Sequence, residues 1–265
     1  AKATILGAPR GNVGGSVLFV GAGRIGLGVG VSLITDAGNS SLILFNRFSS
    51  GSSKALKDAA MTAHQQGRHL VVEVPGKQYS LAVWFDGLGE HSLQAAIQQC
   101  VSDKSILLVL SDSDLCLRAV QKSCSIWMCA VGPALESVID RLGSYDLSPN
   151  RRIDIVALEN DHEEVRRISK KLLNVNPSLA LYPAVVDRIC SEVVAVQQGV
   201  KIIGGIEYEL CTLKTPATEQ IFNEHPFVQL VETDRALEFR HTQKAHMVNL
   251  LHWIIAVVRA NKVIG

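Results

Sequence analysis

Short apolar runs alternate with amphipathic segments through the first two thirds of the chain. Continuous apolar runs of strand length lie at 17–20, 41–46, 105–111 and 125–131, and each is followed by a segment with helical spacing of its apolar residues. Such runs are typical of parallel strands that are buried on both faces. The segment 69–85 instead alternates around a Pro-Gly pair, which predicts an antiparallel hairpin. The pattern predicts an α/β fold with a doubly wound Rossmann-type sheet.

The pattern changes after about residue 190. Strand-like pieces at 192–198 and 227–233 are followed by one long helix from about residue 235. We therefore expect the Rossmann-type sheet to be followed by a smaller α+β segment that ends in this helix. The predicted organisation is an N-terminal arm at 1–16, a dinucleotide-binding domain at 17–190, and the start of a truncated substrate or catalytic domain at 191–265.

Composition and charge exclude several classes of protein. The 265 residues are 47% hydrophobic and carry a formal charge of +1, so no nucleic-acid partner is expected. The longest apolar run, 248–258, is too short for membrane insertion. The six cysteines form no CxxC pair, so we expect reduced core cysteines and assign no metal site. An intracellular, cytoplasmic protein is predicted, with an organelle interior after transit-peptide removal as the alternative.

A glycine-rich turn follows the first apolar run. The sequence "GAGRIG" places Gly21, Gly23 and Gly26 in the G-x-G-x-x-G spacing, with Arg24 and Ile25 between them. The first glycine permits a tight turn, the second lets the backbone approach a pyrophosphate, and the third lets the helix pack on the strand. Because the motif lies between a predicted strand and a predicted helix, it predicts a dinucleotide-binding site formed by these five residues.

The end of the second predicted strand bears on cofactor choice. An NAD site usually has an acidic residue there, whereas this chain has Asn46 and Arg47, followed by Ser49. Without a carboxylate to repel a 2′-phosphate, Arg47 and Ser49 are candidates to hold one, which favours NADP with NAD as the alternative. An ordinary surface arginine is the competing interpretation. Val131 and Gly132, after a later strand, are expected near the nicotinamide end.

Polar residues interrupt the apolar C-terminal helix. The stretch "KAHMVNLLH" places Lys244, Asn249 and His252 within a broad helical face, because positions 244 and 252 differ by about 80°. Apolar surroundings disfavour a charged lysine and lower its pKa, which suits a general base. Asparagine donates hydrogen bonds to a developing alkoxide without titrating. Each residue taken singly is also compatible with a snorkelling lysine or a satisfied core group.

Five segments carry a resemblance to a known family: "VLFVGAGRIGLGVGVSLITDAG", "MCAVGPALESVIDRL", "IDIVALEN", "YPAVVDRI" and "KAHMVNLLH". The chain resembles the polyol-specific long-chain dehydrogenases, and within them the mannitol-1-phosphate 5-dehydrogenases. The resemblance implies hydride transfer between nicotinamide and a polyol or sugar phosphate, of the mannitol 1-phosphate and fructose 6-phosphate type. It also implies that Lys244 is the base, that Asn160 and Asn249 hydrogen-bond the reacting oxygen, and that His252 positions the substrate.

The chain departs from this family in three respects. The acidic residue after the second strand is absent, and the stretch between "ALEN" and "YPAVVDRI" is short. The sequence given also ends soon after the helix that bears Lys244, where the family continues with a helical domain. We therefore expect a partner chain or a missing domain to cover the C-terminal helix. The alternative function is a catalytically inactive, dehydrogenase-like structural subunit of a larger complex, because a fold alone does not establish activity.

Overall fold

The computed structural model describes residues 15–38, 40–49, 54–86, 88, 90–144, 152–187, 190–205 and 208–263. Within these ranges, the backbone alone is described at 90–91, 248–249, 251–253 and 255–263. The predicted N-terminal arm lies outside the described residues except for its last two positions.

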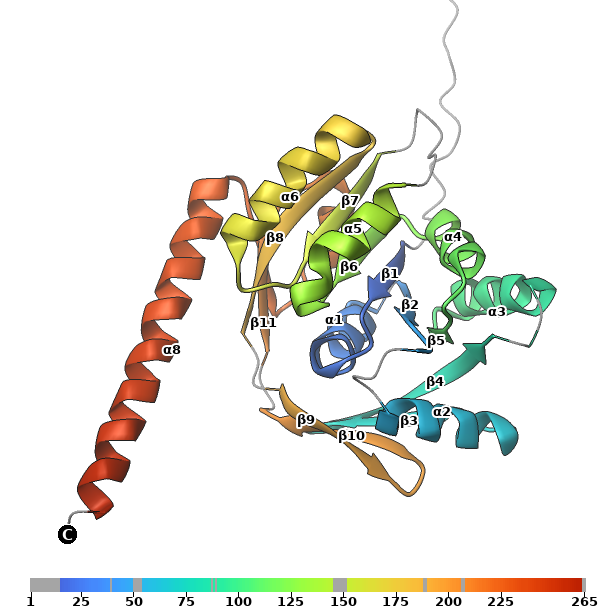
Figure 1. Ribbon diagram of the computed structural model, residues 1–265, viewed down its shortest axis with the longest axis horizontal. Coiled ribbons are helices and arrows are strands. Elements are labelled where there is room, and N and C mark those ends of the chain that lie inside the picture. Colours follow the sequence, from blue (N-terminus) through green and yellow to red (C-terminus); the bar gives the residue numbers. More distant parts are fainter. Residues whose placement is uncertain are drawn as a thin grey trace, which may run out of the picture.

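A 12-stranded mixed sheet forms the centre of the molecule, with helices on both faces (Figure 1). Its middle is parallel throughout, which confirms the predicted doubly wound fold. In sheet order the parallel strands are β8 (Leu179–Asp187), β7 (Ile153–Ala157), β6 (Ile126–Cys129), β1 (Ser16–Val20), β2 (Ser41–Asn46), β5 (Ile106–Leu110) and β4 (Lys77–Phe85). The chain progresses outward in opposite directions from β1, so the order reverses between β1 and β6. In open α/β sheets a ligand crevice forms at the carboxyl ends of the strands at such a point.

The remaining strands extend both edges of this sheet. β3 (Leu70–Val74) pairs antiparallel with β4, which confirms the predicted hairpin. Beyond β3 lie β10 (Gly199–Gly204) and then β9 (Cys190–Val196), while β11 (Glu209–Leu213) and β12 (Val228–Val231) follow β8 at the opposite edge. The strands after residue 190 therefore join the same sheet on both sides, and the domain boundary at that residue stays a prediction.

Helices occupy the connections between strands, as the alternating pattern predicts. The helical segments are η1 (Gly26–Gly30, a π-helical turn), α1 (Val31–Asp36), α2 (Lys54–Gln65), α3 (Glu90–Asp103), α4 (Asp114–Ser123), η3 (Gly132–Ala134), α5 (Leu135–Gly143), α6 (His162–Val175), α7 (Pro216–Phe222) and α8 (Asp234–Val263). Ser113 caps α4 and Asp161 caps α6, each by accepting a hydrogen bond from a backbone amide of the first turn.

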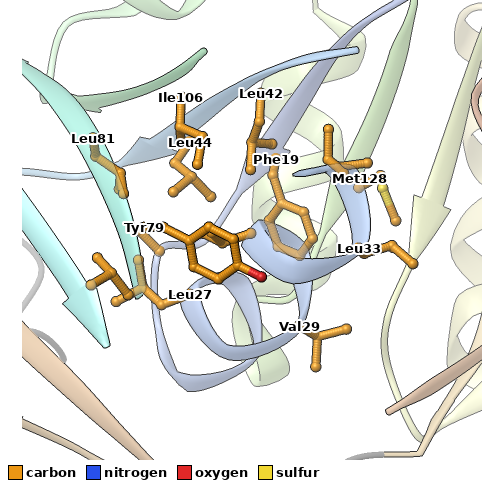
Figure 2. Packing of buried hydrophobic residues seen from close by; sticks show 14 of the residues in the cluster. Phe19, Leu27, Val29, Leu33, Leu42, Leu44, Tyr79, Leu81, Ile106 and Met128 are labelled. Carbon is orange, nitrogen blue, oxygen red and sulfur yellow. The ribbon is translucent and has the colours of Figure 1, made fainter. Parts of the chain in front are cut away.

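Alternate residues of the central strands supply two hydrophobic clusters, one on each face of the sheet. Phe19 aligns with Leu44 of β2 and Met128 of β6, and all three belong to the cluster under η1 and α1 (Figure 2). The adjacent Leu18 and Trp127 belong to the cluster on the other face. Because successive strand residues point to opposite faces, a continuous apolar run is required to bury both.

Among the described side chains of the last helix, α8, those near its beginning pack against the sheet. Leu237 is fully buried with Val185 and Cys211, whereas Met247 is 70% exposed and Leu250 is 58% exposed. Figure 1 shows the C-terminal end of α8 lying away from the sheet. No helix among the described residues is long and apolar enough to cross a membrane.

Candidate active site

A cavity of about 550 Å³ opens at the carboxyl ends of β1 and β6, where the strand order reverses. Most of the predicted site residues line it: Gly21, Gly23, Arg24, Ile25, Asn46, Arg47, Val131, Gly132, Asn160 and Lys244. Gly26 and Ser49 do not line this cavity. The side chains of Asn249 and His252 lie outside the described part of the chain, so their roles stay predictions. The fold thus brings together residues more than 200 positions apart in the sequence.

The three motif glycines meet different surroundings. Gly21 has φ +103°, and a Cβ atom at Gly21 would collide with the backbone oxygen of Ala130. A Cβ atom at Gly26 would collide with the backbone oxygen of Gly21, so the first and third glycines are required by the turn itself. A Cβ atom at Gly23 would meet nothing within 4 Å, although Gly23 lines the cavity. The open space at Gly23 fits a ligand group that approaches the backbone, as a pyrophosphate does.

The helix after the turn also depends on glycines. A Cβ atom at Gly30 would lie 2.7 Å from Cε2 of Phe19, and one at Gly28 would lie 2.6 Å from Sγ of Cys190. The absence of side chains at these positions allows η1 to lie close on β1 and β9. The start of the helix is thereby held beside the glycine turn, the arrangement that binds anions in Rossmann-type folds.

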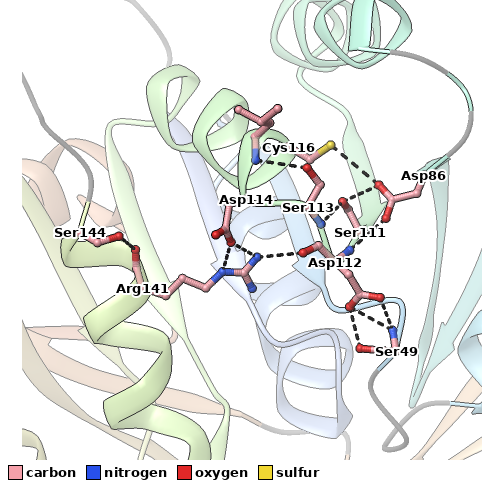
Figure 3. A network of polar contacts seen from close by, with 10 residues as sticks. Ser49, Asp86, Ser111, Asp112, Ser113, Asp114, Cys116, Arg141 and Ser144 are labelled. Atoms are coloured by element: carbon pink, nitrogen blue, oxygen red, sulfur yellow. Dashed lines mark hydrogen bonds and ion pairs between the residues drawn. The ribbon is translucent and has the colours of Figure 1, made fainter.

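Ser49, the serine predicted to bind a 2′-phosphate, donates hydrogen bonds to the carboxylate of Asp112, a contact that the sequence did not predict. The hydroxyl of Ser49 donates to Oδ1 of Asp112 at 2.7 Å, and its backbone amide donates to Oδ2 at 3.0 Å (Figure 3). Asp112 comes from the loop between β5 and α4. The Ser49 hydroxyl holds the pKa of Asp112 below its usual value, and the charges of Arg47 and Arg141 act in the same direction.

A network of hydrogen bonds ties this loop to its neighbours (Figure 3). Asp86, at the end of β4, accepts from the Ser111 hydroxyl at 2.6 Å and from the Asp112 amide at 3.0 Å. Arg141 of α5 pairs with Asp114 and donates to the backbone oxygen of Asp112 at 3.2 Å. Arg141 also lines the cavity, so this network joins the cavity wall to the loops after β4 and β5.

Glu159 is a second residue of the site that sequence reasoning missed. Its Oε1 accepts hydrogen bonds from the amides of Val131 and Gly132, at 2.7 and 2.8 Å. These are the amides that we expected near the nicotinamide end of a cofactor. A ligand that uses them has to displace the Glu159 carboxylate. The place of Glu159 between the end of β7 and Asn160 was the available sequence signal.

Lys244 reaches the cavity from α8. Its Nζ donates to the backbone oxygen of Val186 in β8. Burial lowers the pKa of Lys244 below its usual value, and the nearby charge of Asp187 opposes that shift. The direction is the one expected from the apolar neighbours of this lysine in the sequence.

Two stacked histidines hold the beginning of α8 against the rest of the site. The rings of His162 and His241 lie 3.9 Å apart, and Nε2 of His241 is 3.0 Å from the backbone oxygen of Asn160. His162 is buried, which lowers its pKa to about 4, and the charge of His241 contributes to the same shift. An ion pair between Arg166 and Glu238 joins α6 to α8 beside the stack. Lys244 is therefore carried on a firmly attached part of α8.

The electrostatics of the cavity suit a ligand that carries phosphates. Its charged lining is mostly basic and consists of Arg24, Arg47, Arg141, Lys244 and the single acid Glu159. In the part of the chain that the structure describes, no group of three or more His, Cys, Asp or Glu residues is placed to hold a metal ion.

Comparison with known proteins gives a limited picture. The chain matches no protein-family model and no curated protein sequence. A probable 2-dehydropantoate 2-reductase from Bacillus subtilis has 12% identity and a TM-score of 0.45, covering 83% of this chain and 59% of its own. A UDP-glucose dehydrogenase from Pyrobaculum islandicum has 13% identity and a TM-score of 0.48, and the match covers 88% of this chain and 49% of that protein. Octopine dehydrogenase in complex with NADH and agmatine has 12% identity and a TM-score of 0.42, and the match covers 82% of this chain and 48% of that protein.

The chain spans less than two thirds of the length of each of these three structures. Each is named as a dehydrogenase or a reductase. These comparisons do not test the polyol assignment, which stays a proposal.

Proposed function

We propose that this chain binds NAD or NADP and catalyses hydride transfer between nicotinamide and a polyol or sugar phosphate, of the mannitol 1-phosphate and fructose 6-phosphate type. One observation carries the proposal: the glycine turn at Gly21 and Gly23 and the amine-bearing residue Lys244 line the same cavity. The open space at Gly23 and the basic lining support a bound pyrophosphate. The substrate class rests on the sequence resemblance.

In this proposal the side chains around the cavity manage the proton and the charge of the reacting alcohol. A bound nicotinamide would supply or accept the hydride. Burial lowers the pKa of Lys244, which favours the unprotonated amine, and its Nζ takes the proton of the substrate hydroxyl. Asn160 and Asn249 are the candidates to donate hydrogen bonds to the oxygen as its negative charge develops, and His252 to orient the substrate. The backbone oxygen of Val186 accepts a hydrogen bond from this Nζ and so helps to hold the amine at the cavity.

Replacing the proposed base separates catalysis from cofactor binding. We expect Lys244→Met to lower kcat by about a hundredfold or more, because a positioned general base contributes about 10²–10⁴ in rate. The dissociation constant of NADH should stay close to the wild-type value, because the proposed pyrophosphate contacts lie at the glycine turn. The assay is oxidation of mannitol 1-phosphate, and its reverse with fructose 6-phosphate, followed by nicotinamide absorbance.

Lys170→Met, which removes an exposed lysine of α6, is the matched control and should keep wild-type turnover. Wild-type turnover in Lys244→Met would rule out Lys244 as the base.

The alternative is a catalytically inactive, dehydrogenase-like subunit, and the exposed apolar side chains of α8 favour it. Phe239, Met247 and Leu250 are each more than half exposed on this helix, which is the kind of surface that a partner chain or a further domain covers. Cofactor binding without turnover of any polyol or sugar phosphate, together with stable association through α8, would favour this alternative over the enzyme.

A further inference from the structure

The carboxylate of Asp112 does not line the cavity, but it lies on Ser49, just beyond the end of β2. In Rossmann-type sites an acidic residue at the end of the second strand binds the ribose hydroxyls of NAD. The strand β2 ends at Asn46 without such a residue, but Ser49, three positions later, holds the Asp112 carboxylate by two donors. The loop of Asp112 is beside the end of β2 because β5 is the neighbour of β2 in the sheet.

The hydrogen-bond capacity of this carboxylate suits a ribose hydroxyl. A carboxylate presents about four acceptor positions on its two oxygens. Ser49 donates to Oδ1 through its hydroxyl at 2.7 Å and to Oδ2 through its amide at 3.0 Å. Acceptor positions therefore remain for hydroxyl groups, whereas both donors of Ser49 that a phosphate needs are already used. A phosphate that took them would leave the carboxylate without these partners, at the cost of two hydrogen bonds.

The charge of Asp112 itself acts in the same sense. The charges that act on it are those of Arg47 and Arg141, and Arg141 is already paired with Asp114 (Figure 3). A 2′-phosphate would bring about two further negative charges beside the Asp112 carboxylate, which would repel them.

We infer that Asp112 is the residue that sets cofactor choice: it supplies from the loop after β5 the carboxylate that β2 lacks, and it makes the site select NADH over NADPH. This inference rests on the proposed dinucleotide site. It reverses the preference drawn from the sequence, in which the missing acid after β2 favoured NADP. Arg47 then serves as the counter-charge of Asp112 at the wall of the cavity.

The test is a fluorescence titration of the full chain with NADH and NADPH, in the wild type and in Asp112→Asn. The asparagine oxygen still accepts from Ser49 while the charge is removed. We expect the wild type to bind NADH more tightly than NADPH. In the variant, the affinity for NADPH relative to that for NADH should rise by about tenfold or more. Competition by adenosine 2′,5′-bisphosphate and by 5′-AMP, which differ only in the 2′-phosphate, should show the same change at the adenosine end alone.

Asp103→Asn is the matched control, because it removes one carboxylate at the C-terminus of α3, at the amino edge of the sheet, opposite the cavity. Asp112→Ser provides a second uncharged variant, and circular dichroism checks the folding of each. A wild type that prefers NADPH, or an unchanged NADPH-to-NADH ratio in both Asp112 variants, would overturn the role of Asp112. Binding of neither cofactor by the folded wild type would overturn the proposed function, and this inference with it.

Discussion

Substituting the second and third motif glycines by alanine should separate ligand binding from folding. A methyl group at Gly23 points into open space that belongs to the cavity, whereas a methyl group at Gly26 would lie well under 3.0 Å from the backbone oxygen of Gly21. The two substitutions add the same atom three residues apart. If the cavity holds a pyrophosphate, the first should weaken cofactor binding and the second should weaken the fold.

The magnitudes follow from these surroundings. Gly23 does not adopt a left-handed backbone conformation, so Gly23→Ala should change stability by less than about 1 kcal/mol, in the stabilising direction. Gly26→Ala has to move backbone atoms, which costs about 1–3 kcal/mol or more. For a chain of this size each kcal/mol shifts Tm by about 2–4 °C, so a Tm loss of several degrees is expected for Gly26→Ala.

Thermal unfolding followed by circular dichroism measures the effect on stability, and NADH titration measures the effect on cofactor binding. We expect Gly23→Ala to keep the wild-type Tm and to bind NADH at least about tenfold more weakly, because the methyl group excludes the close backbone approach. Gly205→Ala is the matched control: a Cβ atom there also meets nothing within 4 Å, but Gly205 does not line the cavity. Wild-type affinity for NADH in Gly23→Ala would refute the placement of the pyrophosphate at this turn.

Two further predictions concern titrating groups. The charge of Asp187 opposes the lowering of the Lys244 pKa, so Asp187→Asn should lower that pKa further. In alcohol oxidation kcat/KM rises with pH as the base loses its proton, and the midpoint of this rise should move to lower pH in the variant. An unchanged or raised midpoint would contradict the assignment of Lys244 as the base. His162 has a pKa of about 4 in the folded chain and about 6.5 when unfolded, so the unfolded state binds more protons between these values and stability falls as the pH drops from about 6.5 towards 4. His162→Gln keeps a donor for the Ala184 oxygen and should remove about 2 kcal/mol of this acid sensitivity between pH 7 and pH 5, measured by urea unfolding at the two pH values. Equal sensitivity in both proteins would place its origin elsewhere.

Much of the fold could be predicted from local patterns. The apolar runs that became β1, β2, β5 and β6 had to be buried on both faces, and the hairpin of β3 and β4 followed from alternation around a Pro-Gly turn. The strands β10 and β11 were harder to place, because nothing local indicates that they pair with β3 and β8 at opposite edges of the sheet. Strand pairing over such sequence separations depends on the packing of the whole sheet.

The candidate site shows the same division. The sequence by itself determined the glycine turn, because the steric demands on Gly21 and Gly26 are local, and it marked Lys244 as a polar residue in an apolar helix. Only the tertiary structure decided that Lys244 lines the same cavity as that turn. Only the structure placed Asp112 on Ser49 and Glu159 on the amides of Val131 and Gly132. These contacts join loops that follow different strands, and their partners are set by which strands lie side by side in the sheet, a property that no local pattern of residues encodes.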